Sequence, residues 1–162
     1  MHKVQVQTHD VLSLVGRILI SGIFISAGIS KLKQAKQTEA YIKSKNIPFA
    51  PAARYAAAST EILGGSTLLL GLGSRIGAST LIGFLIPTTL IFHKFWGLNN
   101  EQEKQMQQIN FLKNLAVMGG LLKFVAHGHG VLGVDRLIPE SIVNKANITT
   151  LKDRSRRLLR AA

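Results

Sequence analysis

The sequence contains no cysteine among its 162 residues. Without thiols, the chain forms neither disulfides nor thiolate metal sites, and it carries no Cys-x-x-Cys redox motif. Any redox role would therefore need a bound cofactor or a partner protein to carry the electrons. Acidic residues are also scarce, with 8 Asp and Glu against 20 Lys and Arg, which gives a formal net charge of +12.

The basic residues lie mainly between and beyond the apolar stretches of the chain. Their main groups fall in Lys31–Lys45, Lys94–Lys113 and Arg154–Arg160. A nucleic-acid-binding protein typically carries a basic stripe along one amphipathic element, whereas charged ends of membrane helices contact headgroups and anionic lipid. We therefore expect the lipid bilayer as a partner, anionic lipid at the basic tail, and no nucleic acid.

The most prominent feature of the sequence is a set of long apolar runs. Four of them have roughly the length of a membrane span, which is about 20 residues. They are Val11–Ser30 with Arg17, Ala52–Leu72 with Glu61, Ile76–Phe95 with no charge before His93, and Phe111–Val134 with Lys123. A soluble bundle stays open as an alternative because ionisable residues interrupt the runs, but soluble helices need a polar face and these show none. A cleaved signal peptide is disfavoured for the first run, because it is long and three more follow.

The predicted fold is all-α, a four-helix transmembrane bundle. A short interfacial helix around Tyr41 is expected between the first two spans, and an amphipathic basic tail at the C-terminus. The domain boundaries are a polar leader at 1–10, a membrane domain at 11–135 and the basic tail at 136–162. Pro87 is expected as a tolerated kink in the third span. Asn99–Gln108 is predicted to be a hydrophilic loop, so the fourth helix would begin near Asn110.

Four spans place both termini on the same side of the membrane. Lys and Arg are equally frequent on the two sides of this topology, so the positive-inside rule does not decide the orientation. The dense arginines of the tail favour the cytoplasm for both termini. We expect a multi-pass protein of a bacterial inner membrane.

The ionisable residues inside the spans are the candidate functional sites, because a charge in a bilayer costs several kcal/mol. A rise of about 1.5 Å per residue places Glu61 roughly 10 Å below one membrane surface. The residues that antiparallel packing brings near that level form one predicted ligand pocket: Glu61, His93, Asn114, Ser26 and Lys31. His93 is the expected partner of Glu61 that changes charge near neutrality. The alternative is that Glu61 only holds helices together by hydrogen bonds.

A second polar set lies toward the other surface. Its members are Arg17 and Lys123, with His127, His129 and Asp135 nearer the surface. Arg17 and Lys123 are explained equally well as side chains that extend to the headgroups. Two histidines without a nearby carboxylate make a weak metal signal, so no metal site is expected.

Several short motifs, taken in order, resemble the DoxX family of small bacterial membrane proteins. They cover about residues 11–135 and are Gly16-Arg17, Phe24–Leu32, Ile47-Pro48, Glu61–Gly65, Leu70-Gly71, Thr88-Thr89, His93–Trp96, Asn110–Ala116 and Gly119–Leu122. The resemblance implies a four-helix inner-membrane protein. Because the family is named after a subunit of a thiosulfate:quinone oxidoreductase, it also implies a link to quinone or oxidative-stress systems.

Three functions are therefore compatible with the sequence. The first is a subunit or accessory factor of a quinone-linked redox system, with a redox partner protein and Glu61 and His93 near the quinone head. The chain has no haem, flavin, iron–sulfur or metal motif, so quinone is the one cofactor that the resemblance suggests. The second is a transporter for a small solute or lipophile, and the third is a membrane scaffold that acts through its basic tail.

Overall fold

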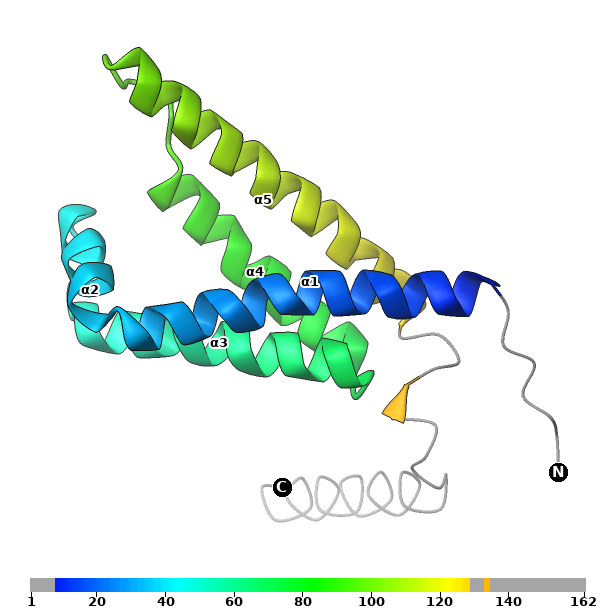
Figure 1. Cartoon of the computed structure of the whole chain (residues 1–162). Coiled ribbons are helices and arrows are strands. Elements are labelled where there is room, and N and C mark those ends of the chain that lie inside the picture. The colour runs from blue at the N-terminus through cyan, green and yellow to red at the C-terminus, as the bar shows by residue number, and fades with distance from the viewer. Residues whose placement is uncertain (1–7, 129–132, 135–162) are drawn as a thin grey trace, which may run out of the picture.

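The computed structural model describes residues 8–128 and 133–134, and these contain five α-helices. They are α1 (Thr8–Lys33), α2 (Ala35–Ser44), α3 (Ala50–Leu70), α4 (Ser74–Phe92) and α5 (Glu101–His127). Figure 1 shows α1 and α3 side by side, α4 and α5 slanting away from them, and the short α2 at one end. The four long helices thus form two pairs, α1 with α3 and α4 with α5, that are joined where α3 meets α4.

Three of the helices, α1, α4 and α5, are long and apolar enough to cross a membrane. The helix α3, which covers the second predicted span, has 21 residues and enough length. It has no stretch of 18 residues as apolar as those in the other three, because it contains Arg54, Glu61 and many small residues. Its crossing of a bilayer therefore stays a prediction, which its packing alongside α1 supports.

Two predicted boundaries were wrong. Residues 8–10, assigned to the polar leader, form the first turn of α1, and Asp10 is buried in the fold. The hydrophilic segment before the last span is not a loop, because α5 begins at Glu101. The Asn100 side chain caps this helix, and its Oδ1 accepts hydrogen bonds from the backbone N–H of Gln102 and Glu103. Polar residues with good helix propensity then continue the helix into the apolar segment.

Some earlier assignments lie outside the described residues. These are residues 1–7 of the leader, His129, Asp135 and the basic tail at 136–162.

A short helix does occur in the connection between α1 and α3, where the sequence predicted one. The helix α4 continues through Pro87.

Close packing of α1 against α3 depends on two glycines that face the partner helix. A Cβ on Gly28 of α1 would lie 2.7 Å from Cγ1 of Ile62 and 2.9 Å from the Ala58 carbonyl oxygen. A Cβ on Gly65 of α3 would lie 2.9 Å from Cγ1 of Ile25. Small residues let membrane helices approach until their backbones are in contact. These contacts bring the end of α1 against the middle of α3, where Glu61 lies.

We expect Gly28→Ala to lower the free energy of unfolding by about 1–3 kcal/mol, because the added methyl group overpacks the interface. Gly22→Ala is the matched control, since no atom lies within 4 Å of a Cβ at that position of the same helix. The control should be neutral or more stable by up to about 1 kcal/mol, because Ala is the better helix former. Thermal unfolding of both variants in detergent measures the difference. Equal stabilities would show that α1 and α3 are not in close contact at Gly28.

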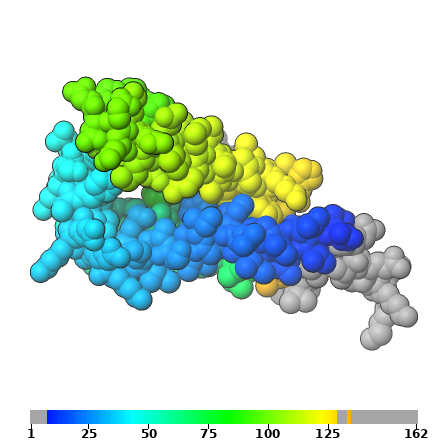
Figure 2. Space-filling view, turned by 45° about the horizontal axis from the view of Figure 1, so that its top comes forward, coloured from blue at the N-terminus to red at the C-terminus, as the bar shows by residue number. Residues whose placement is uncertain are grey.

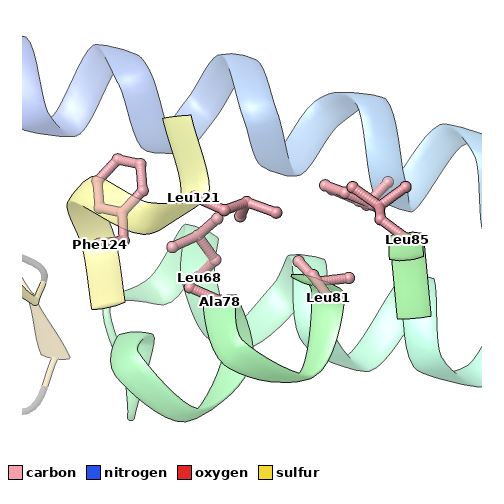
Figure 3. Close-up of a cluster of buried hydrophobic side chains, with 7 residues drawn as sticks. Leu68, Ala78, Leu81, Leu85, Leu121 and Phe124 are labelled. Carbon is pink, nitrogen blue, oxygen red and sulfur yellow. The ribbon is translucent and has the colours of Figure 1, made fainter. Parts of the chain in front are cut away.

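The apolar core lies along α4, where the two pairs of helices meet. Figure 3 shows Leu68 of α3, three residues of α4 and two of α5 converging beneath α1. The buried members of this cluster are Phe24, Leu68, Ala78, Leu81, Leu85, Leu121 and Phe124. The members of the cluster on α4 lie between Ala78 and Leu85, which leaves the C-terminal end of that helix outside the cluster.

Candidate functional site

The strongest polar contact between the helices joins Lys31, at the end of α1, to Glu61, in the middle of α3. Nζ of Lys31 lies 2.8 Å from Oε1 and 2.8 Å from Oε2 of Glu61. The Glu61 side chain is 7% exposed and the Lys31 side chain 28% exposed. A buried carboxylate is stable only when it is paired or protonated. The partner of Glu61 is therefore Lys31, and not His93 as the depth argument predicted.

Lys31 also lines a cavity in the described part of the chain. The cavity has a volume of about 550 Å³ and lies between α2, α3 and the C-terminal end of α4. Its lining residues are Lys31, Gln34, Gln37, Thr38, Tyr41, Ile42, Ile47, Ala53, Ala56, Ala57, Thr60, Phe84, Thr88, Phe92 and His93. Figure 2 shows the molecule hollowed between the blue and cyan segments, α1 and α2, and the green start of α5.

The lining combines apolar walls with a few polar groups. Aliphatic side chains and the rings of Phe84, Phe92 and Tyr41 form most of the surface. Pockets for small organic ligands typically have volumes of about 300–1,000 Å³ and this kind of mixed lining. A lysine ammonium has three donors, and Glu61 accepts from two of them. One donor of Lys31 is therefore available to a ligand with an acceptor oxygen.

His93 borders the cavity from the C-terminal end of α4. Its Nδ1 lies 3.0 Å from Oε1 of Gln107, on α5. The adjacent Phe92 holds α2 in place, because its carbonyl oxygen accepts a hydrogen bond of 3.1 Å from the Tyr41 hydroxyl. Their rings also pack at a centroid distance of 5.3 Å. Three helices, α2, α4 and α5, are thus connected at this edge of the cavity.

Two other members of the predicted pocket lie elsewhere. Nδ2 of Asn114 donates a hydrogen bond of 3.0 Å to Oγ1 of the buried Thr89, so Asn114 joins α5 to α4. Ser26 is exposed, and its hydroxyl donates to the Ile23 carbonyl oxygen of its own helix. By depth, Ser26 was expected level with Glu61 and Asn114 nearer the surface, but neither side chain lines the cavity.

The structure also contains site residues that the sequence analysis did not single out. Polar side chains line the cavity from three places: Gln34 just before α2, Thr38 on α2 and Thr60 on α3. Arg54 is a further such residue: its side chain is 6% exposed and its Nε lies 2.9 Å from Oε1 of Glu39. This ion pair fixes α2 onto α3. In the sequence, the apolar residues around Tyr41 are the feature that indicates packing of α2 against the membrane domain.

The two main members of the second polar set, Arg17 and Lys123, differ in burial. Arg17 is 1% exposed, so its extension to headgroups was a wrong alternative. Ser13 and Ser21 are buried on the same face of α1. Lys123 is exposed, and its carbonyl oxygen lies 3.2 Å from Nδ1 of His127. Within residues 8–128 and 133–134, no group of three His, Cys, Asp or Glu side chains is arranged to hold a metal ion.

Comparison with known proteins assigns this architecture to a family. The DoxX family profile matches residues 12–94, which include the α1–α4 residues of the cavity. Inner membrane protein YqjF of Escherichia coli (strain K12) is 30% identical over 131 residues, covering 80% of this chain and 93% of that protein. Inner membrane protein YphA of the same organism is 29% identical over 126 residues, covering 78% of this chain and 89% of that protein. No solved structure matches the chain. The matched segment, the extent of the two relatives and the long apolar helices lead to one conclusion, that this chain belongs to the DoxX family.

Proposed function

We propose that this protein is a four-span inner-membrane protein that binds a quinone-type ring, as a subunit or accessory factor of a quinone-linked redox or oxidative-stress system. The names of its two relatives and its three apolar helices support the location. The short α2 would then lie at the membrane surface. The observation that carries the ligand assignment is the cavity, with Lys31 held at its edge by Glu61.

The lining fits a quinone head for three reasons. The rings of Phe84, Phe92 and Tyr41 offer apolar faces to a flat ring. The available donor of Lys31 suits a carbonyl oxygen at the edge of such a ring. The volume of about 550 Å³ accommodates a substituted ring with the start of its isoprenoid tail. When bound, the quinone would accept or release the electrons, since the chain has no cysteine for this purpose.

Transport of a solute across the membrane is less well supported. The cavity is lined by the C-terminal part of α4, from Phe84 to His93. The remainder of that helix packs into the buried cluster around Leu81 and Leu121. A solute leaving the cavity toward the other surface would have to pass through this apolar core.

We expect quinone to co-purify with the wild-type protein in mild detergent and to be lost when the cavity is filled. Ala57→Phe places a ring in the cavity, whereas Ala52→Phe makes the same change at an exposed position of α3 outside the lining. Retained quinone, extracted and quantified by chromatography, should fall at least about tenfold in Ala57→Phe, equivalent to about 1.4 kcal/mol of binding. It should stay unchanged in Ala52→Phe. Absence of quinone from the wild type, or equal retention in both variants, would refute the proposal.

A further inference from the structure

Three polar side chains from three helices lie next to one another at the edge of the cavity. They are Tyr41 on α2, His93 at the end of α4 and Gln107 on α5. Nδ1 of His93 lies 3.0 Å from Oε1 of Gln107. Gln107 also lies beside Tyr41, near enough for its side chain to affect the hydroxyl. Tyr41 and His93 line the cavity, and Gln107 does not. Gln107 can therefore affect a ligand only through the side chains that it contacts.

The direction of each hydrogen bond follows from the number of hydrogens available. The Tyr41 hydroxyl has one hydrogen, which it donates to the Phe92 carbonyl oxygen at 3.1 Å. Burial raises the pKa of this phenol above its usual value of 10.0, so the hydroxyl keeps its hydrogen at neutral pH. Toward a neighbouring Gln107, Tyr41 can therefore act only as an acceptor, which favours the Gln107 orientation with its NH₂ group on the Tyr41 side. The carbonyl oxygen of Gln107 then faces His93, as observed.

This arrangement selects one tautomer of the neutral His93 ring. A carbonyl oxygen only accepts hydrogen bonds, so the hydrogen of the imidazole is on Nδ1. The other nitrogen, Nε2, then carries a lone pair and is an acceptor. Because Nδ1 is used by Gln107, Nε2 is the nitrogen that a ligand in the cavity meets. The cavity thus combines a donor, on Lys31, with an acceptor, on His93.

We propose that the cavity prefers the reduced, hydroxyl-bearing form of its ring ligand, the quinol, over the oxidised quinone, and that Gln107 is the positioning residue for this preference. The inference rests on the proposed function. A quinol hydroxyl donates to Nε2 of His93, while its other oxygen accepts from Lys31. A quinone has two carbonyl oxygens and no donor, so one acceptor would face another and both would stay unsatisfied in a partly buried site.

The test compares the two redox forms of one soluble probe, decylubiquinone and decylubiquinol. Binding of each to the detergent-purified full-length protein is measured by anaerobic calorimetry at pH 8, above the ordinary pKa of an imidazole. We expect the wild type to bind the quinol at least about tenfold more tightly, since a site that bonds a hydroxyl rejects the analogue without one. Equal binding, or tighter binding of the quinone, would overturn the inference and leave the proposed function standing. Binding of neither form would overturn both.

Variants of Gln107 separate positioning from a purely structural role. Gln107→Leu removes the acceptor for Nδ1, so the ratio of the two affinities should fall toward one. Gln107→Glu keeps an acceptor oxygen and should preserve the preference. Gln108→Leu makes the same change at an exposed neighbour on α5 and should leave the ratio unchanged. An unchanged ratio of quinol to quinone affinity in Gln107→Leu would assign the preference to another residue. If this variant does not fold, the comparison of the two ligands on the wild type still tests the preference itself.

Discussion

Replacing Lys31 with Met is expected to lower the free energy of unfolding by about 3–5 kcal/mol, because it leaves a buried carboxylate without its counter-charge. Glu61 is 7% exposed, and both of its oxygens lie 2.8 Å from Nζ of Lys31. Glu61→Gln should cost less, since Lys31 is 28% exposed and can turn toward water or headgroups. The double variant Lys31→Met/Glu61→Gln should recover much of the loss, because no charge is then left buried.

Equilibrium unfolding in detergent measures all three variants as a double-mutant cycle. Lys33→Met is the matched control, since Lys33 is exposed two residues further along α1 and should change stability by less than about 0.5 kcal/mol. The double variant also separates folding from binding, because it lacks the donor that faces the cavity and should lose quinone while staying folded. If Lys31→Met were as mild as Lys33→Met, the ion pair would not form in the folded protein.

The partners of the buried charges could not be predicted from sequence. A rise per residue gives the depth of a side chain along a helix, and by this measure Ser26 lies level with Glu61, with His93 nearer the same membrane surface. Depth carries no information on which neighbouring helix a side chain faces. Ser26 therefore lies on the exposed side of α1, while Lys31, one turn and a half later, lies against Glu61.

The start and end of a helix could be predicted from the sequence only where they coincide with the ends of an apolar run. Long apolar runs indicated α1, α3 and α4 with small errors at their ends. The start of α5 was missed because the segment from Glu101 is hydrophilic. Asn100 followed by Glu103 is a capping signal that would have located this start. Such a cap acts on the backbone and is independent of hydropathy.

The contacts of α2 needed the tertiary structure. A ten-residue helix is not stable alone, so its position depends on what it packs against. Arg54 and Glu39 lie fifteen residues apart in the chain, and nothing in their spacing shows that they pair. The same is true of Gln107, which is one of several similar glutamines in its segment. Its role at the cavity follows only from its contact with His93.

The second large effect is expected at Leu81, in the middle of α4. Leu81 is 0% exposed, and a Cβ on Gly64 of α3 would lie 2.8 Å from its Cγ. Leu81→Ala should lower the free energy of unfolding by about 2–5 kcal/mol, because it opens a cavity where α3, α4 and α5 meet. Thermal or denaturant unfolding in lipid bicelles measures the loss.

Leu90→Ala on the same helix provides the contrast that also tests the membrane location. Leu90 is 49% exposed on the surface of the described chain. Lipid tails are as apolar as a leucine side chain, so lipid fills the space left by the missing methyl groups without a cavity. The loss should therefore stay below about 0.5 kcal/mol. Equal losses at both positions would mean that the Leu90 face of α4 is packed against protein, which would contradict a lipid-facing surface there.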